Sequence, residues 1–300
     1  WKTIFNWSKN NSMVESLPEG IDKIQIGSGV YNVKSYAEVG KPYGAIYAKT
    51  FKRDAEGYIL CQLDGSPKEG QDYEYLGCVQ ADWRGGWNNV FRLGNFSFSV
   101  MFDFQKGGKF FSQTSIQSSV DGQSVKSLEG RDADFFSRKI LGESDEERYG
   151  FMRPQNANTP TANGQIYPDW GRPKGVVLPN CRYDEDVEGL AGQQVLGYCT
   201  PERYWMHYTS RDISRFIYDA SYVKLREITV SYDLPKKWLR KTPFQTFRVA
   251  AVGRNIATLF ANTPHGLDPQ ATSTTGNAQG FERGFNLPSA TYGFDIKVSF

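Results

Sequence analysis

The chain has 300 residues, a net charge of +2, 39% hydrophobic residues and 15% aromatic residues. This composition is too apolar for a disordered chain, and the balanced charge excludes the electrostatic footprint that nucleic-acid binding needs. No run of about 18 apolar residues predicts a membrane-spanning helix. A mean hydropathy of −0.54 combined with 20 Phe and 17 Tyr is typical instead of a membrane β-barrel, whose strands alternate lipid-facing and lumen-facing residues.

Six segments show the period-two alternation of strands that have one apolar face. In one of them the alternation changes phase near Arg226 and Glu227, which predicts a β-bulge. The last segment is the clearest, because Tyr292, Phe294, Ile296, Val298 and Phe300 alternate with polar residues or Gly. In chain order the predicted strands are residues 1–7, 83–93, 95–105, 222–234, 246–256 and 291–300.

The connections between these strands alternate between long and short. Leu93–Gly94–Asn95 predicts a tight turn, and residues 233–245 form a short basic link. The long connections cover about 9–80, 107–217 and 260–289. Outer-membrane barrels have this rhythm of short periplasmic turns and long extracellular loops. An eleven-residue strand tilted by about 45° also covers roughly 25 Å, the height of their apolar band. The prediction is an all-β fold, a segment of a transmembrane antiparallel barrel.

The sequence also contains candidates for covalent and metal chemistry. Its cysteines form two local pairs in loop-like sequence, which favours two disulfides in an oxidising compartment, with four thiols as the alternative. The acidic run 184–186 could bind a structural Ca²⁺, although a solvated turn explains it as well, and no other cofactor is expected. No catalytic motif is present, so we expect no enzyme activity. The expected disulfide pairs are Cys61 with Cys78 and Cys181 with Cys199.

Several landmarks resemble the SusC-like TonB-dependent transporters. Residues 218–235 read YDASYVKLREITVSYDLP and resemble the penultimate hairpin of that family. Further resemblances, in the family's order, are FNWSKNN at 5–11, VGKPYG at 39–44, NFSFS at 95–99, VGRNI at 252–256, GLDP at 266–269 and the closing strand at 287–300. One departure is the stretch 63–67, where many members carry an acidic glycine-containing loop.

The resemblance implies the C-terminal part, about six strands, of a 22-stranded barrel in the outer membrane of a Gram-negative bacterium. The family's N-terminal plug domain and TonB box are not in this sequence. It also implies active import of oligosaccharides or peptides, driven through TonB, with a SusD-like surface lipoprotein as a lid and a dimer of transporter–lipoprotein pairs as a compatible assembly. Two alternatives stay open: a secreted β-sandwich that binds carbohydrate, and a passive porin.

Two further sets of residues gain a role from the resemblance. The closing strand, from Tyr292 to Phe300, is similar to the C-terminal signal that the outer-membrane assembly machinery reads. Aromatic residues in the connection 107–217 are candidates for contacts with cargo or with the lid, although packing of the loop onto itself is an alternative. These candidates are Trp170, Tyr183, Tyr198, Trp205 and Tyr208.

Overall fold

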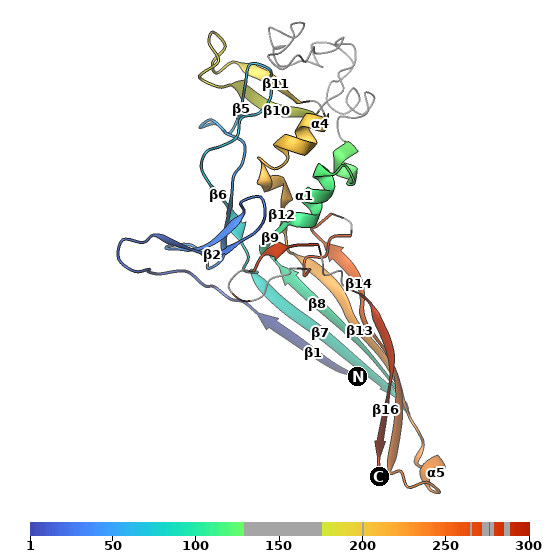
Figure 1. Cartoon of the computed structure of the whole chain (residues 1–300). Helices are drawn as coiled ribbons and strands as arrows, with labels where there is room; N and C mark the ends of the chain where they lie inside the picture. The colour runs from blue at the N-terminus through green and yellow to red at the C-terminus, as the bar shows by residue number, and fades with distance from the viewer. Residues whose placement is uncertain (129–175, 200, 265, 272–275, 277–278, 285–288) are drawn as a thin grey trace.

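The computed structural model describes residues 1–128, 176–199, 201–264, 266–271, 276, 279–284 and 289–300 (Figure 1). Its largest unit is a six-stranded antiparallel sheet in the order β1-β7-β8-β13-β14-β16. The order of these strands across the sheet is the same as their order along the chain. The strands are β1 (Lys2–Ser8), β7 (Trp83–Leu93), β8 (Phe96–Lys106), β13 (Tyr222–Asp233), β14 (Thr246–Ala261) and β16 (Thr291–Ser299).

These six strands confirm the six that the alternation predicts, with two informative details. The ladder of β13 shifts register between Leu225 and Glu227 on both of its sides, which confirms the predicted bulge. The strand β14 continues to Ala261, five residues beyond the predicted end, because Tyr222 at the start of β13 pairs with Ala261. Pairing with a long neighbour therefore extends a strand beyond the segment where its own alternation is evident.

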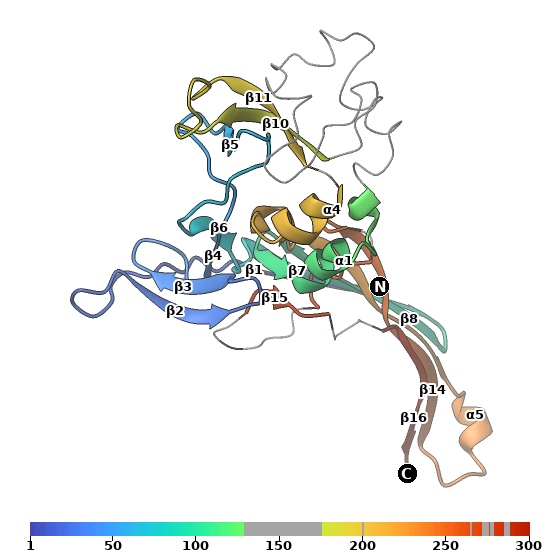
Figure 2. The same cartoon turned by 45° about the horizontal axis from the view of Figure 1, so that its top comes forward.

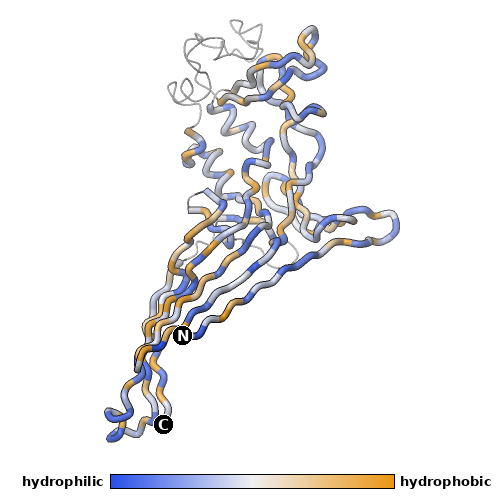
Figure 3. Tube along the Cα trace, turned by 180° about the vertical axis from the view of Figure 1, so that it is seen from behind, coloured by the Kyte–Doolittle hydropathy of each residue, from blue (hydrophilic) through white to orange (hydrophobic). Residues whose placement is uncertain are grey.

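The register gives the sheet one apolar face. Phe102 lies between Trp87 of β7 and Leu225 of β13, and neighbouring rings on this face stack, with 5.8 Å between the ring centroids of Trp87 and Phe102. Figure 3 shows the apolar and polar positions interleaved along the strands. Side chains of the apolar face are unusually exposed, up to 85% for Phe294. A β-sandwich would cover this face with a second sheet, and the described part of the chain supplies none.

The opposite face, here called the polar face, carries the other set of side chains. Asp103, Lys224 and Thr258 lie side by side on β8, β13 and β14, as do Ser97, Ser231 and Ala250 nearer the other end. Successive side chains of a strand point to opposite faces, so the neighbours in sequence of each polar-face residue lie on the apolar face. The same strand pairing therefore produces both faces.

The long connections fold into a cap over one end of the sheet (Figures 1 and 2). One small sheet has the order β2-β3-β4-β6, another β12-β9-β15, and a third β11-β10-β5. Their strands are β2 (Lys23–Ser28), β3 (Lys34–Glu38), β4 (Ala45–Ala48), β5 (Ile59–Cys61), β6 (Glu74–Cys78), β9 (Lys109–Ser112), β10 (Val176–Tyr183), β11 (Gln194–Cys199), β12 (Ile217–Asp219) and β15 (Phe281–Glu282).

Short helices complete the cap and the basic link. Ser112 caps α1 by accepting a hydrogen bond from the backbone N–H of Ser115 at 3.1 Å. No helix among the described residues is long and apolar enough to cross a membrane. The helical elements are α1 (Gln113–Val120), η1 (Val125–Leu128), α4 (Pro201–Arg203), the π-helix η2 (Tyr204–Tyr208), η3 (Ile213–Phe216) and α5 (Lys236–Leu239).

The cap is held together by contacts between different connections. Phe111 of β9 pairs with Ile217 of β12 on one side and with Phe281 of β15 on the other. Phe111, Phe216 and Phe281 are almost fully buried in one apolar cluster. A second cluster surrounds Trp205. The cap is therefore a folded unit that all three long connections help to build.

We expect the two faces of the sheet to tolerate a charge very differently if lipid covers the apolar one. Phe98→Lys should lower the free energy of unfolding by about 2–4 kcal/mol, the cost of lysine in the apolar band. Urea unfolding in lipid vesicles measures this value. The control, Ser99→Lys, places the same charge on the polar face of the same strand and should change the stability much less. Equal losses in the two variants would contradict a lipid-covered face.

Candidate functional site: the polar face beneath the cap

The polar face carries charges of both signs that pair across neighbouring strands. Arg248 donates two hydrogen bonds to Asp233, at 2.6 and 2.8 Å, in the bidentate geometry that is typical of a guanidinium bound to a carboxylate. Arg254 donates to Glu227 at 2.9 Å. These pairs are partly exposed, so each contributes little stability, but together they leave the face hydrophilic.

A lysine on this face is almost completely buried beneath the cap. Lys224 is 1% exposed, and its Nζ donates to both carboxylate oxygens of Asp268, at 2.5 Å, and to Oε1 of Gln270, at 3.0 Å. Burial of an ammonium group is tolerated only when such partners replace water. Since Lys224 belongs to β13 and Asp268 to the connection after β14, this ion pair fixes the segment 266–271 against the polar face.

Gln270 extends the ion pair into a network. Its side-chain oxygen also accepts a hydrogen bond from Arg226, and its amide nitrogen donates to the hydroxyl of Tyr222 at 2.5 Å. That hydroxyl donates to Asp103 at 3.2 Å, and Arg226 donates to the same carboxylate at 2.7 and 2.9 Å. The network therefore joins β8, β13 and the segment 266–271.

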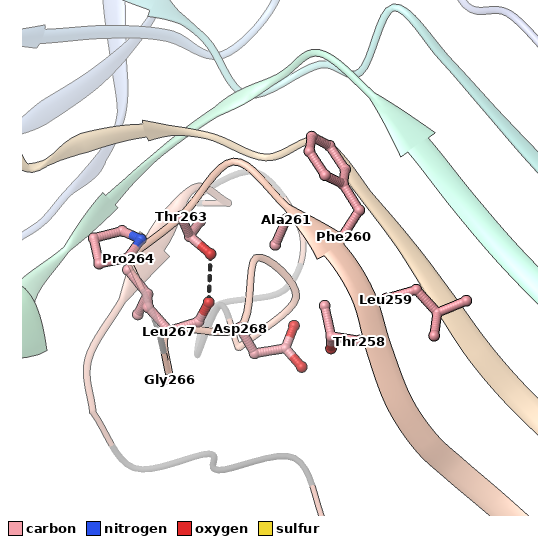
Figure 4. A pocket seen from close by; sticks show the side chains of 9 residues that line it. All are labelled: Thr258, Leu259, Phe260, Ala261, Thr263, Pro264, Gly266, Leu267 and Asp268. Atoms are coloured by element: carbon pink, nitrogen blue, oxygen red, sulfur yellow. Dashed lines mark hydrogen bonds between the residues drawn. The ribbon is translucent and has the colours of Figure 1, made fainter.

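Two hollows lie next to this network. One, of about 430 Å³, lies between the end of β14 and the segment 263–268, with the Asp268 carboxylate toward it (Figure 4). Thr263 holds the turn of this segment by donating to the carbonyl of Leu267 at 2.6 Å. The hollow has both polar and apolar walls.

The second hollow lies between the polar face and the cap. Its volume is about 220 Å³, and the residues that line it include Arg84, Lys109, Gln105, Gln270 and Tyr222. Lys109 is paired with Asp219 at 3.4 Å, whereas Arg84 forms no ion pair among the residues that the structure describes. The site can therefore donate hydrogen bonds to carboxylate or carbonyl oxygens.

The loop aromatics predicted to contact cargo occupy a different environment. Tyr183, Trp205 and Tyr208 are 2–3% exposed and form part of the apolar cluster around Trp205. Their rings pack the cap, which corrects the interpretation of these three as exposed contacts. Tyr198 lies in β11 with its backbone opposite Val177. Trp170 lies outside the described residues.

The cysteines are arranged differently from the expected local pairs. None of the four forms a disulfide in the structure. Because β5 pairs in parallel with β10, Cys61 lies beside the strand that contains Cys181, while Cys78 lies in another sheet. A hydrogen bond with Cys181 and burial together raise the pKa of the Cys61 thiol. Burial raises the pKa of Cys199 to about 12. The two expected disulfides are thus absent from this arrangement.

The acidic run considered for Ca²⁺ is engaged by lysines. Asp184, with a side chain 4% exposed, lies 2.8 Å from Lys52 and 2.9 Å from Lys68, which also contacts Asp186. Burial alone would raise the pKa of Asp184, but hydrogen bonds from the two lysines outweigh it and lower the pKa to about 2. Across the described ranges, no group of three or more His, Cys, Asp or Glu side chains is arranged to hold a metal ion.

The predicted C-terminal set lies on the edge strand of the sheet. Tyr292, Phe294 and Ile296 are exposed on the apolar face, and Val298 is half-buried. The ring of Phe300 follows the strand and packs against Phe244, 5.2 Å away between centroids. The open edge of β16 leaves its backbone groups available for one more strand.

Sequence reasoning missed Lys224, Asp268 and Gln270 as a unit. The positions carried a signal, since Lys224 is on the polar phase of a predicted strand and Asp268 is in a family landmark. Their separation of 44 residues along the chain hid the contact.

The comparisons with known proteins agree with this architecture. No protein-family model matches the sequence. The TonB-dependent receptor P3 of Formosa agariphila is 23% identical over 314 residues, which cover 97% of this chain and 25% of that protein. The chain therefore spans about a quarter of the length of this relative.

Solved structures show the same fold. The RagAB peptide importer in its open-open state aligns with 99% of this chain and 26% of its own, at 15% identity and a TM-score of 0.51. A second structure, of the RagAB peptide transporter, gives a TM-score of 0.51 at 14% identity, over 99% of this chain and 27% of its own. These relatives are named as a receptor, an importer and a transporter, in agreement with the prediction that the chain is not an enzyme.

We expect the buried ion pair to control the segment 266–271. Lys224→Met leaves the Asp268 carboxylate buried without its cation, which should cost about 3–5 kcal/mol of stability. Thermal unfolding and hydrogen exchange of residues 266–271 should both show the loss. The double variant Lys224→Met, Asp268→Leu should recover most of it.

The matched control is Arg254→Met, which removes an exposed pair of the same face and should cost less than about 1 kcal/mol. If Lys224→Met changed exchange in the segment no more than Arg254→Met does, the ion pair would not hold the segment.

Proposed function

We propose that this chain is part of a SusC-like TonB-dependent transporter, and that its sheet forms part of the wall of an outer-membrane barrel that imports peptides. The observation that carries this proposal is the two-faced sheet. Its apolar face is rich in exposed rings and suits lipid, while its polar face carries ion pairs and suits a hydrated lumen. The membrane is the outer membrane of a Gram-negative bacterium, and the short turns face the periplasm.

The groups at the hollow beneath the cap support peptides as the substrate class. Arg84 and Lys109 offer hydrogen-bond donors to carboxylates and peptide carbonyls. Of the cap aromatics expected to stack on sugars, Tyr183, Trp205 and Tyr208 are buried. Peptides therefore fit the site better than oligosaccharides, and the similar RagAB structures are of a peptide importer.

The cap is the surface for a partner. A SusD-like surface lipoprotein closing over the barrel would contact the cap, since the cap covers the end of the sheet remote from the short turns (Figure 1). Energy would come through TonB, acting on a plug domain in the complete transporter. Pairs of transporter and lipoprotein would assemble as a dimer.

Uptake of labelled peptides by cells with the full-length transporter tests this function. Arg84→Gln should raise the half-saturating concentration of peptides about tenfold, the effect of losing roughly 1.4 kcal/mol of binding. Arg92→Gln, at the other end of the same strand and face, is the control and should leave it unchanged. Deleting the TonB box should stop uptake.

Other outcomes would contradict the proposal in different ways. Uptake of oligosaccharides but not of peptides would show that the substrates are glycans. Uptake that survives deletion of the TonB box would indicate a passive porin.

The C-terminal residues have a separate role in assembly. We expect deletion of Phe300 to lower the amount of transporter in the outer membrane severalfold, because the assembly machinery would lose the aromatic end of the closing strand. Quantitative blotting of outer-membrane fractions measures this. The half-saturating peptide concentration of the remaining transporter should stay unchanged. Normal abundance of the truncated protein would refute this role.

A further inference from the structure

The link between β13 and β14 concentrates positive charge. Residues 234–245, here called the basic turn, contain four cations and no acidic residue. All four are exposed, and within the described ranges none of them forms an ion pair. The cations are Lys236, Lys237, Arg240 and Lys241. Such an uncompensated cluster within six residues creates a local field that attracts anions.

The basic turn is a fixed platform for these cations. The short helix α5 buries Leu239, and the backbone N–H of Thr242 donates to the carbonyl of Leu239 at 2.9 Å. Both ends of the turn are tied to the sheet, since Leu234 donates to the carbonyl of Phe247 at 2.8 Å and Gln245 to that of Ser299 at 2.7 Å. The charges are therefore held at the end of the strands.

Aromatic rings connect the basic turn to the apolar face. The ring of Phe244 packs against Phe247 of that face at 5.9 Å and against Phe300 at 5.2 Å. Trp238, within the turn itself, is 60% exposed. Exposed Trp beside a ring cluster is typical of the level where hydrocarbon meets headgroups. The cations thus lie at the border of the apolar face.

We propose that the basic turn binds the headgroups of anionic phospholipids in the leaflet at the short-turn end of the barrel. The inference rests on the proposed function, because it needs the apolar face to be in a membrane. Lysine and arginine near a membrane surface attract anionic headgroups, while the exposed indole enters the interface. An acidic soluble protein would use the charges but gives no role to Trp238 and the adjoining rings.

Native mass spectrometry of the full-length transporter tests the proposal. The protein in mild detergent is mixed with equal amounts of phosphatidylglycerol and phosphatidylcholine, and the ratio of the two bound lipids is measured. Lys236→Gln with Lys237→Gln should lower the phosphatidylglycerol preference about 25-fold, since each of the two cations near the surface contributes about fivefold. Raising the salt concentration should weaken the preference of the unmodified protein.

Two matched variants make the result specific. Lys9→Gln with Lys106→Gln removes two exposed lysines elsewhere and should leave the lipid ratio unchanged. Lys236→Arg with Lys237→Arg keeps the charge and should preserve the preference. Equal lipid ratios in all these proteins would overturn the proposal and would favour an acidic soluble protein as the ligand of the basic turn.

The lipid ratio and the peptide uptake assay together separate this inference from the proposed function. A transporter that prefers phosphatidylglycerol but imports no peptide would contradict the proposed function and support the lipid site. An active importer without lipid preference would contradict the lipid site alone.

Discussion

The structure depends on one constraint, the pairing of six strands whose alternations are in phase. When Phe102 aligns with Trp87 and Leu225, all three side chains emerge on the same side, and the polar residues between them emerge on the other. A slip of one residue in any strand would place charges among the rings. The β13 bulge at 226 shows how the chain keeps this order, because it corrects the phase where the sequence changes it.

The cap depends on the sheet in turn. The sheet places the three long connections at one end, and there Phe111, Ile217 and Phe281 join the second and third of them in one small sheet. The first connection packs against this small sheet through Val33 and Ile46. Lys224 and Asp268 then fix one connection to the polar face. Since contacts between different connections form the cap, its walls and the hollow beneath it are products of the whole chain and of no single loop.

These long-range contacts explain where sequence reasoning stopped. Cys61 was expected to pair with Cys78, its neighbour along the chain, yet a parallel strand pairing places Cys61 beside the strand of Cys181. Trp205 and Tyr208 were candidates for surface contacts because they lie in a long connection, yet they fill a core that the connection shares with another. Neither arrangement has a local pattern, because both depend on segments more than 100 residues apart.

The sequence by itself determined the strands, their order of long and short connections, the bulge and the two faces. All of these follow from period-two alternation and turn residues, which act over a few residues. Only the tertiary structure decided that the connections fold into a cap, that Lys224 is buried against Asp268, and that a hollow bearing Arg84 lies beneath. The physical reason is that burial of a charge or a ring depends on partners brought together by strand pairing, and these are distant along the chain.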